Sequence, residues 1–181
     1  MTIRWYRLAA NPRTPVYWGL TPPRIPSARF DAPKGEFGVL YAGVDAYCAF
    51  IETYGHVTGT RWVTLAALRE RSLFEIRFGH PLRLVNLTGH HLAGLGADSG
   101  LFSGDYTVSQ AWSLAFFNHP SAPDGLYYHT CHDPSRMSLA LYQRGDIESQ
   151  VSFTSLGTLA DSGNRALLGK ILDTYRFALL P

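Results

Sequence analysis

The chain has 181 residues, of which 46% are hydrophobic and 17% are charged. This balance is typical of one globular domain over residues 1–181 and excludes disordered and fibrous classes. The formal net charge of +2 is too small, and the basic residues too scattered, to indicate direct binding to nucleic acid. The sequence contains neither an apolar signal-peptide core nor a run long enough to span a bilayer, so we expect a cytoplasmic protein.

The N-terminal part combines a predicted strand with a proline-rich segment. Residues 3–9 have the composition of a strand. Residues 11–33 hold six of the eleven prolines, which remove backbone donors and disfavour a helix. The aromatic residues Tyr17, Trp18 and Phe30 in this segment favour an ordered, irregular loop.

A strand followed by a helix is the clearest local pattern. Residues 38–42 (GVLYA) form a short apolar run typical of a strand. Asp45 is positioned to cap a helix over residues 46–54, and Gly55 would end it. At 100° per residue, Glu52 falls near the edge of the apolar face of this helix. Its carboxylate is therefore expected to point into a cleft beside the core.

The rest of the chain mixes helices and strands without regular alternation. Helices are predicted over residues 63–71, 88–95, 107–119 and 164–177, and strands over residues 74–78, 82–87, 126–129, 137–142 and 151–156. Because regular βαβ units are missing, the pattern favours an α+β fold over a doubly wound sheet.

Common catalytic and metal-binding motifs are missing from the sequence. It has no GxGxxG, GxxxxGK[ST], GxSxG or HExxH. The densest group of metal-ligand types runs from His129 to His132. In a strand, His129 and Cys131 would share one face, with Thr130 and His132 on the other. The four could not converge on one ion, so we expect no metal site and single out Thr130. Cys131 and Cys48 are too few for a disulfide framework and are predicted to be reduced.

Three residues near the first helix invite a functional interpretation, and each has a simpler alternative. Arg29 could form a surface ion pair of little energetic value. Tyr41 could be a core residue with a satisfied hydroxyl. Glu52 is harder to explain by packing, because a carboxylate beside a core face needs a cationic or hydrogen-bonding partner.

Several blocks of the sequence resemble the RES domain family, which is named for an arginine, a glutamate and a serine. The blocks are Arg29-Phe30, residues 34–35, 39–42 and 49–52, residues 124–130 (DGLYYHT), and Arg136 with residues 138–142 (SLALY). Residues 6–8 (YRL) resemble the family's opening strand, and residues 110–111 its helix before the last block. The family's serine falls on Thr130, which keeps a hydroxyl and adds a methyl group that could crowd a substrate.

The resemblance implies a fold, an activity and partners. The fold would be similar to that of ADP-ribosyltransferases, with mixed β-sheets flanked by helices. The activity would be that of a toxin of a bacterial type II toxin–antitoxin system that degrades NAD, its substrate, by phosphorolysis or hydrolysis and without a metal. The partner would be an Xre-type helix-turn-helix antitoxin, which would supply any contact with nucleic acid. Self-association as a homodimer is also implied.

The residue chemistry suits this activity. Cleaving the nicotinamide–ribose bond passes through a sugar cation, which the nearby carboxylate of Glu52 would stabilise. Arg7 and Arg29 would hold the pyrophosphate or the ribose as forked donors. Tyr41 would pack against the nicotinamide or its ribose, and Thr130 would hydrogen-bond near the bond that breaks. The predicted catalytic residues are therefore Arg29, Tyr41, Glu52 and Thr130, and Arg7 joins them in binding NAD.

Two other functions stay open from the sequence. The same pocket could transfer ADP-ribose to a protein such as a metabolic enzyme, because the acceptor enters after the bond has loosened. The chain could instead be an interaction module that has lost catalysis, with Thr130 as the sign of that loss. The proline-rich residues 11–33 would form a wall or lid of the pocket in the enzymatic readings.

Overall fold

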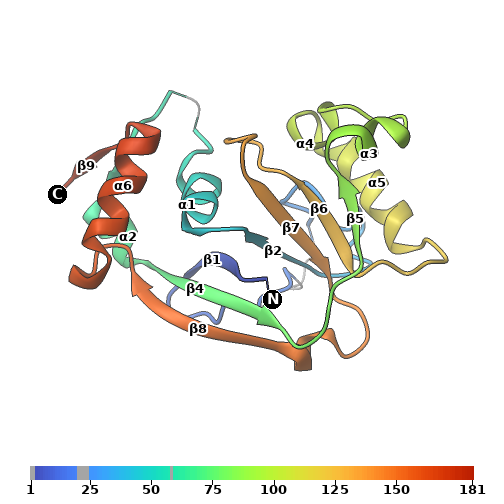
Figure 1. Cartoon of the computed structure of the whole chain (residues 1–181), viewed down its shortest axis with the longest axis horizontal. Coiled ribbons are helices and arrows are strands. Elements are labelled where there is room, and N and C mark those ends of the chain that lie inside the picture. The colour runs from blue at the N-terminus through green and yellow to red at the C-terminus, as the bar shows by residue number, and fades with distance from the viewer. Residues whose placement is uncertain (1–2, 20–24, 58) are drawn as a thin grey trace.

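The computed structural model describes residues 3–19, 25–57 and 59–181. Its main sheet contains β1 (Trp5–Ala10), β2 (Val39–Gly43), β4 (Arg71–Phe78), β5 (Leu84–Leu87), β6 (Gly125–His129), β7 (Met137–Tyr142) and β8 (Val151–Thr158). In the described part of the chain these strands lie in the order β5-β6-β7-β2-β1-β4-β8 (Figure 1). Only β5 and β6 run parallel; every other neighbouring pair in this sheet is antiparallel.

Helices and a small second sheet complete the fold. The helices are α1 (Ala46–Tyr54), α2 (Leu65–Arg69), α3 (Gly89–Gly94), α4 (Gly100–Ser103), α5 (Tyr106–Phe117) and α6 (Arg165–Tyr175), with 3-10 turns at Ile147–Gln150 and Ser162–Asn164. The second sheet pairs β3 (Trp62–Thr64) with β9 (Ala178–Leu180) in parallel.

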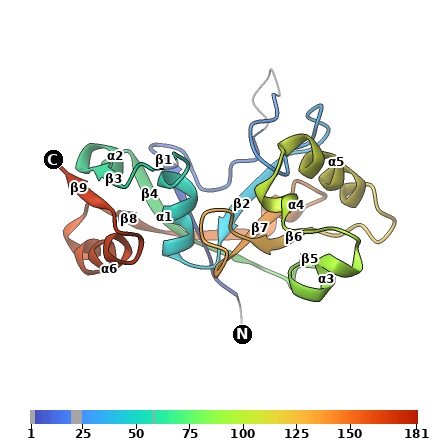
Figure 2. The same ribbon diagram turned by 90° about the horizontal axis from the view of Figure 1, so that it is seen from above.

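The helices gather in two groups at opposite ends of the molecule (Figures 1 and 2). One group holds α1, α2 and α6, and the other holds α3, α4 and α5. The first group packs a core around Phe50, Leu73 and Ile171. The second packs around Phe30 and Leu126. The central strands β1 and β2 therefore pass between two separate helical cores.

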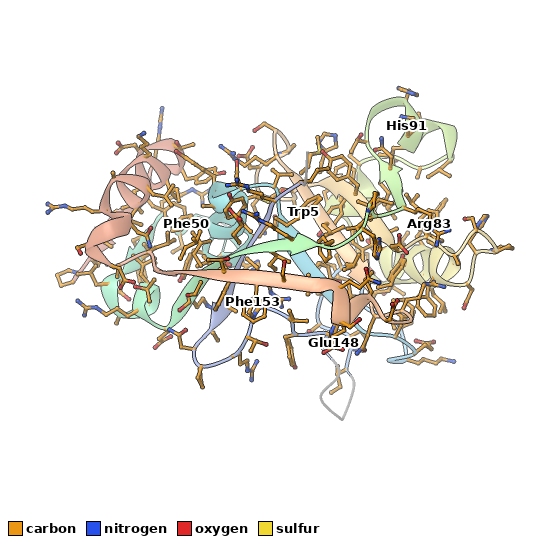
Figure 3. The ribbon with its side chains drawn as sticks, turned by 60° about the horizontal axis from the view of Figure 1, so that its bottom comes forward. Trp5, Phe50, Arg83, His91, Glu148 and Phe153 are labelled. Atoms are coloured by element: carbon orange, nitrogen blue, oxygen red, sulfur yellow. The ribbon has the colours of Figure 1, made fainter. Side chains whose placement is uncertain are left out.

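A third core covers other side chains of the central strands, including Trp5, Leu40 and Ile76. Figure 3 shows Trp5 near the middle of the sheet and Phe153 on β8, which is an edge strand of that sheet. Phe153 is 44% exposed, and its ring packs edge-on against Phe74 of the neighbouring strand. Burial of apolar surface between the layers is the main stabilising term of such a fold.

Helix α1 is fixed at both ends by local chemistry. The Asp45 carboxylate accepts a hydrogen bond from the Cys48 backbone N–H at 2.8 Å, as an N-cap does. At the other end, the Gly55 N–H donates to the Ile51 carbonyl oxygen at 2.8 Å. Gly43 lies so close to Cys48 that a Cβ there would collide with its side chain. The absence of a side chain at Gly43 therefore lets α1 lie directly on the end of β2.

The predicted α+β architecture, a mixed sheet flanked by helices, is confirmed. The single helix predicted over residues 63–71 is wrong in its first part, because residues up to Thr64 form β3. Thr64 then caps α2 by accepting from the Ala67 N–H at 3.0 Å. Strand β3 pairs with β9, which follows more than a hundred residues later, so no local sequence pattern predicts β3. Helix α4 and strand β9 were not predicted.

The described parts of the proline-rich segment, residues 11–19 and 25–33, contain neither helix nor strand. Trp18 and Phe30 are buried there, at 5% and 0% exposure, as an ordered loop requires. Two of its prolines, Pro22 and Pro23, lie outside the described residues. Among the helices that the structure describes, none is both long and apolar enough to cross a membrane.

Candidate active site

A cavity of about 390 Å³ opens on the sheet between the two helical groups. That volume lies in the range of roughly 300 to 1,000 Å³ typical of small-molecule sites. Its walls come from β1, β2, β6, β7, α1, the loop before β2, the start of α5 and the segments after α1 and β6. The lining residues are Tyr6, Arg7, Leu8, Ser27, Ala28, Arg29, Tyr41, Ala42, Gly43, Cys48, Ala49, Glu52, Thr53, His56, Tyr106, Tyr128, Cys131, His132 and Ser138.

Glu52 projects from α1 into this cavity, as its position on the helix predicts. Burial raises the pKa of its carboxyl group, while the backbone N–H groups of His132 and Cys131 and the charges of His56 and Arg29 oppose that rise. Its Oε1 atom is buried, and no described residue donates a hydrogen bond to it. A buried carboxylate oxygen without a partner is costly unless a ligand satisfies it.

Arg29 stands close enough to Glu52 for its charge to lower the pKa of that carboxyl group. Its guanidinium donates to the Gly104 carbonyl oxygen at 2.8 Å and lies over the Tyr106 ring, 4.5 Å from the centroid. Among the described residues, no carboxylate lies within 4 Å of it, so the surface ion pair considered from the sequence is not formed. The guanidinium of Arg29 is therefore held in one orientation, and its positive charge can pair with an anionic ligand.

Arg7 reaches the cavity from β1 and also braces the proline-rich loop. One nitrogen of its guanidinium donates to the carbonyl oxygens of Pro15 at 3.1 Å and Tyr17 at 3.2 Å. Burial lowers the pKa of Arg7 to about 10, which still leaves it charged at neutral pH. Arg7 therefore combines a structural task with a positive charge at the cavity wall.

Tyr41 lines the cavity, and its hydroxyl group makes two hydrogen bonds. The hydroxyl donates to Asp31 Oδ1 at 2.9 Å and accepts from the Phe30 N–H at 3.0 Å. Burial, with the negative charge of Asp31, raises the pKa of Tyr41 well above its ordinary value. Both partners directly follow Arg29 in sequence, so Tyr41 holds the loop that carries this arginine.

Thr130 is completely buried and, although its position is described, is not among the residues that line the cavity. Its Oγ1 lies 2.9 Å from Ser138 Oγ and 3.1 Å from Cys48 Sγ. The expected alternation of faces through residues 129–132 is wrong, because β6 ends at His129 and the chain bends. Cys131 and His132 consequently both line the cavity.

Several lining residues were missed by the sequence analysis, chiefly His56, His132, Tyr106 and Ser138. His56 follows Gly55 beyond the end of α1, so helical spacing from Glu52 does not predict its position. The rings of His56 and His132 meet edge to face, with centroids 5.4 Å apart. Burial lowers the pKa of both histidines, which favours their neutral forms.

The cavity is lined by two positively charged groups and one carboxyl group. Guanidinium groups of Arg7 and Arg29 can receive an anion, and the open oxygen of Glu52 can accept a hydrogen bond or face a developing cation. The described residues contain no cluster of three or more histidine, cysteine, aspartate or glutamate side chains able to hold a metal ion.

Comparison with known proteins gives the following matches. A family model described as RES domain matches residues 4–155. A chain of the crystal structure of the M. tuberculosis MbcT–MbcA toxin–antitoxin complex has a similar fold, with a TM-score of 0.64 and 18% sequence identity. That match covers 94% of this chain and 89% of the other. No curated protein matches this sequence.

Proposed function

Since this chain belongs to the RES domain family, we propose that it is the toxin of a bacterial toxin–antitoxin system and degrades NAD by breaking the nicotinamide–ribose bond. The observation that carries the proposal is the buried, unpartnered oxygen of Glu52 in a cavity that Arg7 and Arg29 also line. The similar fold of a chain in the MbcT–MbcA toxin–antitoxin complex supports the biological role.

Glu52 would act on the ribose next to the bond that breaks. Departure of neutral nicotinamide leaves positive charge on the sugar, and a fixed carboxylate stabilises that charge without donating a proton. The free Oε1 can accept a ribose hydroxyl, which would satisfy the oxygen that lacks a partner in the described structure. The reaction therefore needs the ionised form of Glu52.

The two arginines would bind the anionic part of the dinucleotide. Arg29 is held over Tyr106 and by the Gly104 carbonyl oxygen, so little side-chain freedom is lost when it binds a phosphate. Arg7 adds a second positive charge from β1. The ring of Tyr41 would supply a flat apolar surface for the nicotinamide or its ribose.

The proposal extends to partners. An antitoxin of the Xre helix-turn-helix type would bind the toxin in the cytoplasm and carry any contact with nucleic acid, and the toxin would form a homodimer. A carboxylate at the end or in a tail of the antitoxin could enter the cavity and pair with Arg7 and Arg29. Such a tail would compete directly with NAD.

The test is to incubate the purified chain with NAD, with and without inorganic phosphate, and to follow nicotinamide release by chromatography. Release that requires phosphate indicates phosphorolysis, and release without it indicates hydrolysis. The alternative, transfer to a protein, is tested in the same way with labelled NAD and a cell lysate, where a labelled protein band would support it. Absence of nicotinamide release under all three conditions would contradict the proposed function.

A further inference from the structure

A cluster of three small polar side chains lies at the floor of the cavity. Thr130 follows β6, Ser138 is on β7 and Cys48 is on α1. The Thr130 and Ser138 hydroxyl oxygens are 2.9 Å apart, and Cys48 Sγ lies 3.1 Å from the first and 3.3 Å from the second. All three residues are buried, with exposures of 0%, 3% and 0% in that order.

The members of this cluster differ in their access to the cavity. Ser138 and Cys48 line it, and Thr130, which is described, does not. Ser138 on β7 is paired with Gly43 on β2, which also lines the cavity. Gly43 has no side chain, so it does not cover Ser138. The Thr130 N–H is held by the Arg136 carbonyl oxygen at 3.0 Å, which fixes the backbone of Thr130 behind the wall.

Hydrogen-bonding capacity also favours Ser138 as the residue that a ligand can reach. A hydroxyl group donates one hydrogen bond and accepts two, whereas a thiol is a weak partner. Ser138 makes one hydroxyl contact and one longer thiol contact inside the cluster, and its hydroxyl also hydrogen-bonds the Tyr128 side chain. The weak thiol contact is therefore the one that a ligand in the cavity would replace. Thr130 has equal capacity but no opening through which a ligand could use it.

We propose that Ser138 supplies the hydroxyl group that reaches the bound dinucleotide, and that Thr130 is a positioning residue that acts through Ser138. This inference rests on the proposed function. The threonine methyl group then lies behind the cavity wall, where it does not crowd a substrate. Thr130 orients the Ser138 hydroxyl through their 2.9 Å contact.

The test is a double-mutant cycle on nicotinamide release from NAD with the full chain. Ser138→Ala removes one neutral hydrogen bond and should lower kcat/KM by about 3-fold to 10-fold. Thr130→Val keeps the shape of the side chain and removes its hydroxyl group. It should lower kcat/KM by no more than Ser138→Ala does. The double variant should match Ser138→Ala alone, because Thr130 has no effect once Ser138 is lost.

Conservative variants separate positioning from folding. Thr130→Ser keeps the hydroxyl and should recover the activity that Thr130→Val loses. Ser152→Ala, at an exposed serine of β8, is the matched control and should behave as the wild type. If Ser138→Ala fails to fold, Ser138→Cys replaces it, because it keeps the volume and removes the strong donor.

The outcomes separate this inference from the proposed function. Losses that multiply in the double variant, or full activity of Ser138→Ala beside a weakened Thr130→Val, would overturn the inference and leave the NAD activity standing. A wild-type chain that releases no nicotinamide would contradict the proposed function and this inference with it.

Discussion

The hydroxyl group of Tyr41 donates a hydrogen bond to Asp31 at 2.9 Å and so ties strand β2 to the loop that carries Arg29. The same carboxylate accepts from the backbone N–H groups of Ser27 and Ala28 at 2.9 and 2.8 Å, which closes the loop on itself. Arg29 therefore depends for its position on a residue in the floor of the cavity.

Tyr41→Phe tests this link. It removes a hydrogen bond to a charged group, so we expect the free energy of unfolding to fall by about 1.5 to 3 kcal/mol. The KM for NAD should rise because the loop with Arg29 loosens. Urea denaturation and steady-state kinetics measure the two effects. Unchanged values of both would show that the loop is held by other contacts.

Arg29→Lys tests the value of the forked, stacked guanidinium. Lysine keeps the charge but loses the planar contact with Tyr106 and the paired donors, so KM for NAD should rise by about 10-fold or more. Arg13→Lys is the matched control, because Arg13 also lies over a tyrosine ring, that of Tyr17 at 5.2 Å, outside the cavity lining. Equal kinetics for the two variants would refute a role of Arg29 in binding.

Asp45 allows the cap of α1 to be separated from its ion pair with Arg136. Asn is as good a cap as Asp, so Asp45→Asn should lose only the ion pair, whereas Asp45→Ala should cost about 0.5 to 2 kcal/mol more through loss of the cap. Because α1 carries Glu52, only the alanine variant should also lower kcat. Chemical denaturation and turnover on the same preparations check this, and equal behaviour of the two variants would contradict it.

The raised pKa of Glu52 makes a prediction for stability against pH. A carboxyl group whose pKa is higher in the folded state favours folding at pH below its unfolded value, and that contribution is lost as pH rises through the folded value. Glu52→Gln should therefore stabilise the protein relative to the wild type at pH 7, and the difference should shrink by pH 4. Urea unfolding at both pH values measures it. If Glu52→Gln were less stable than the wild type at pH 7, the prediction would be contradicted.

The same pKa affects catalysis. Because the reaction needs ionised Glu52, the acid limb of kcat/KM, which reports the free enzyme, should lie above the ordinary glutamate range. A pH profile of nicotinamide release shows this limb directly. A limb at or below the ordinary value would mean that Glu52 is not the group whose ionisation controls turnover.

Local signals in the sequence predicted the elements that carry Glu52 and Tyr41. Asp45 caps α1 as its position indicates, and the apolar run before it forms β2. Family resemblance, more than periodicity, led to Arg7 and Arg29, and the structure brings both to the cavity that Glu52 lines.

What could not be predicted depends on contacts between distant residues. The predicted strand over residues 126–129 ends where β6 ends, but the sequence does not show the bend after it that places His132 on the cavity and Thr130 behind it. The contact of Thr130 with Ser138 requires β6 and β7 to be paired, and Cys48 joins them only because α1 lies on the end of β2. Tyr106 joins the site only because α5 begins beside Arg29.

The rate of nicotinamide release from NAD by the wild type and by Glu52→Gln, measured side by side, tests the central claim most directly. Glu70→Gln, at an exposed glutamate after α2, serves as the control. We predict release by the wild type and by the control, and a fall of at least about 10-fold in Glu52→Gln, since a hydrogen bond to a charged group is lost. Equal rates for the wild type and Glu52→Gln would contradict the account.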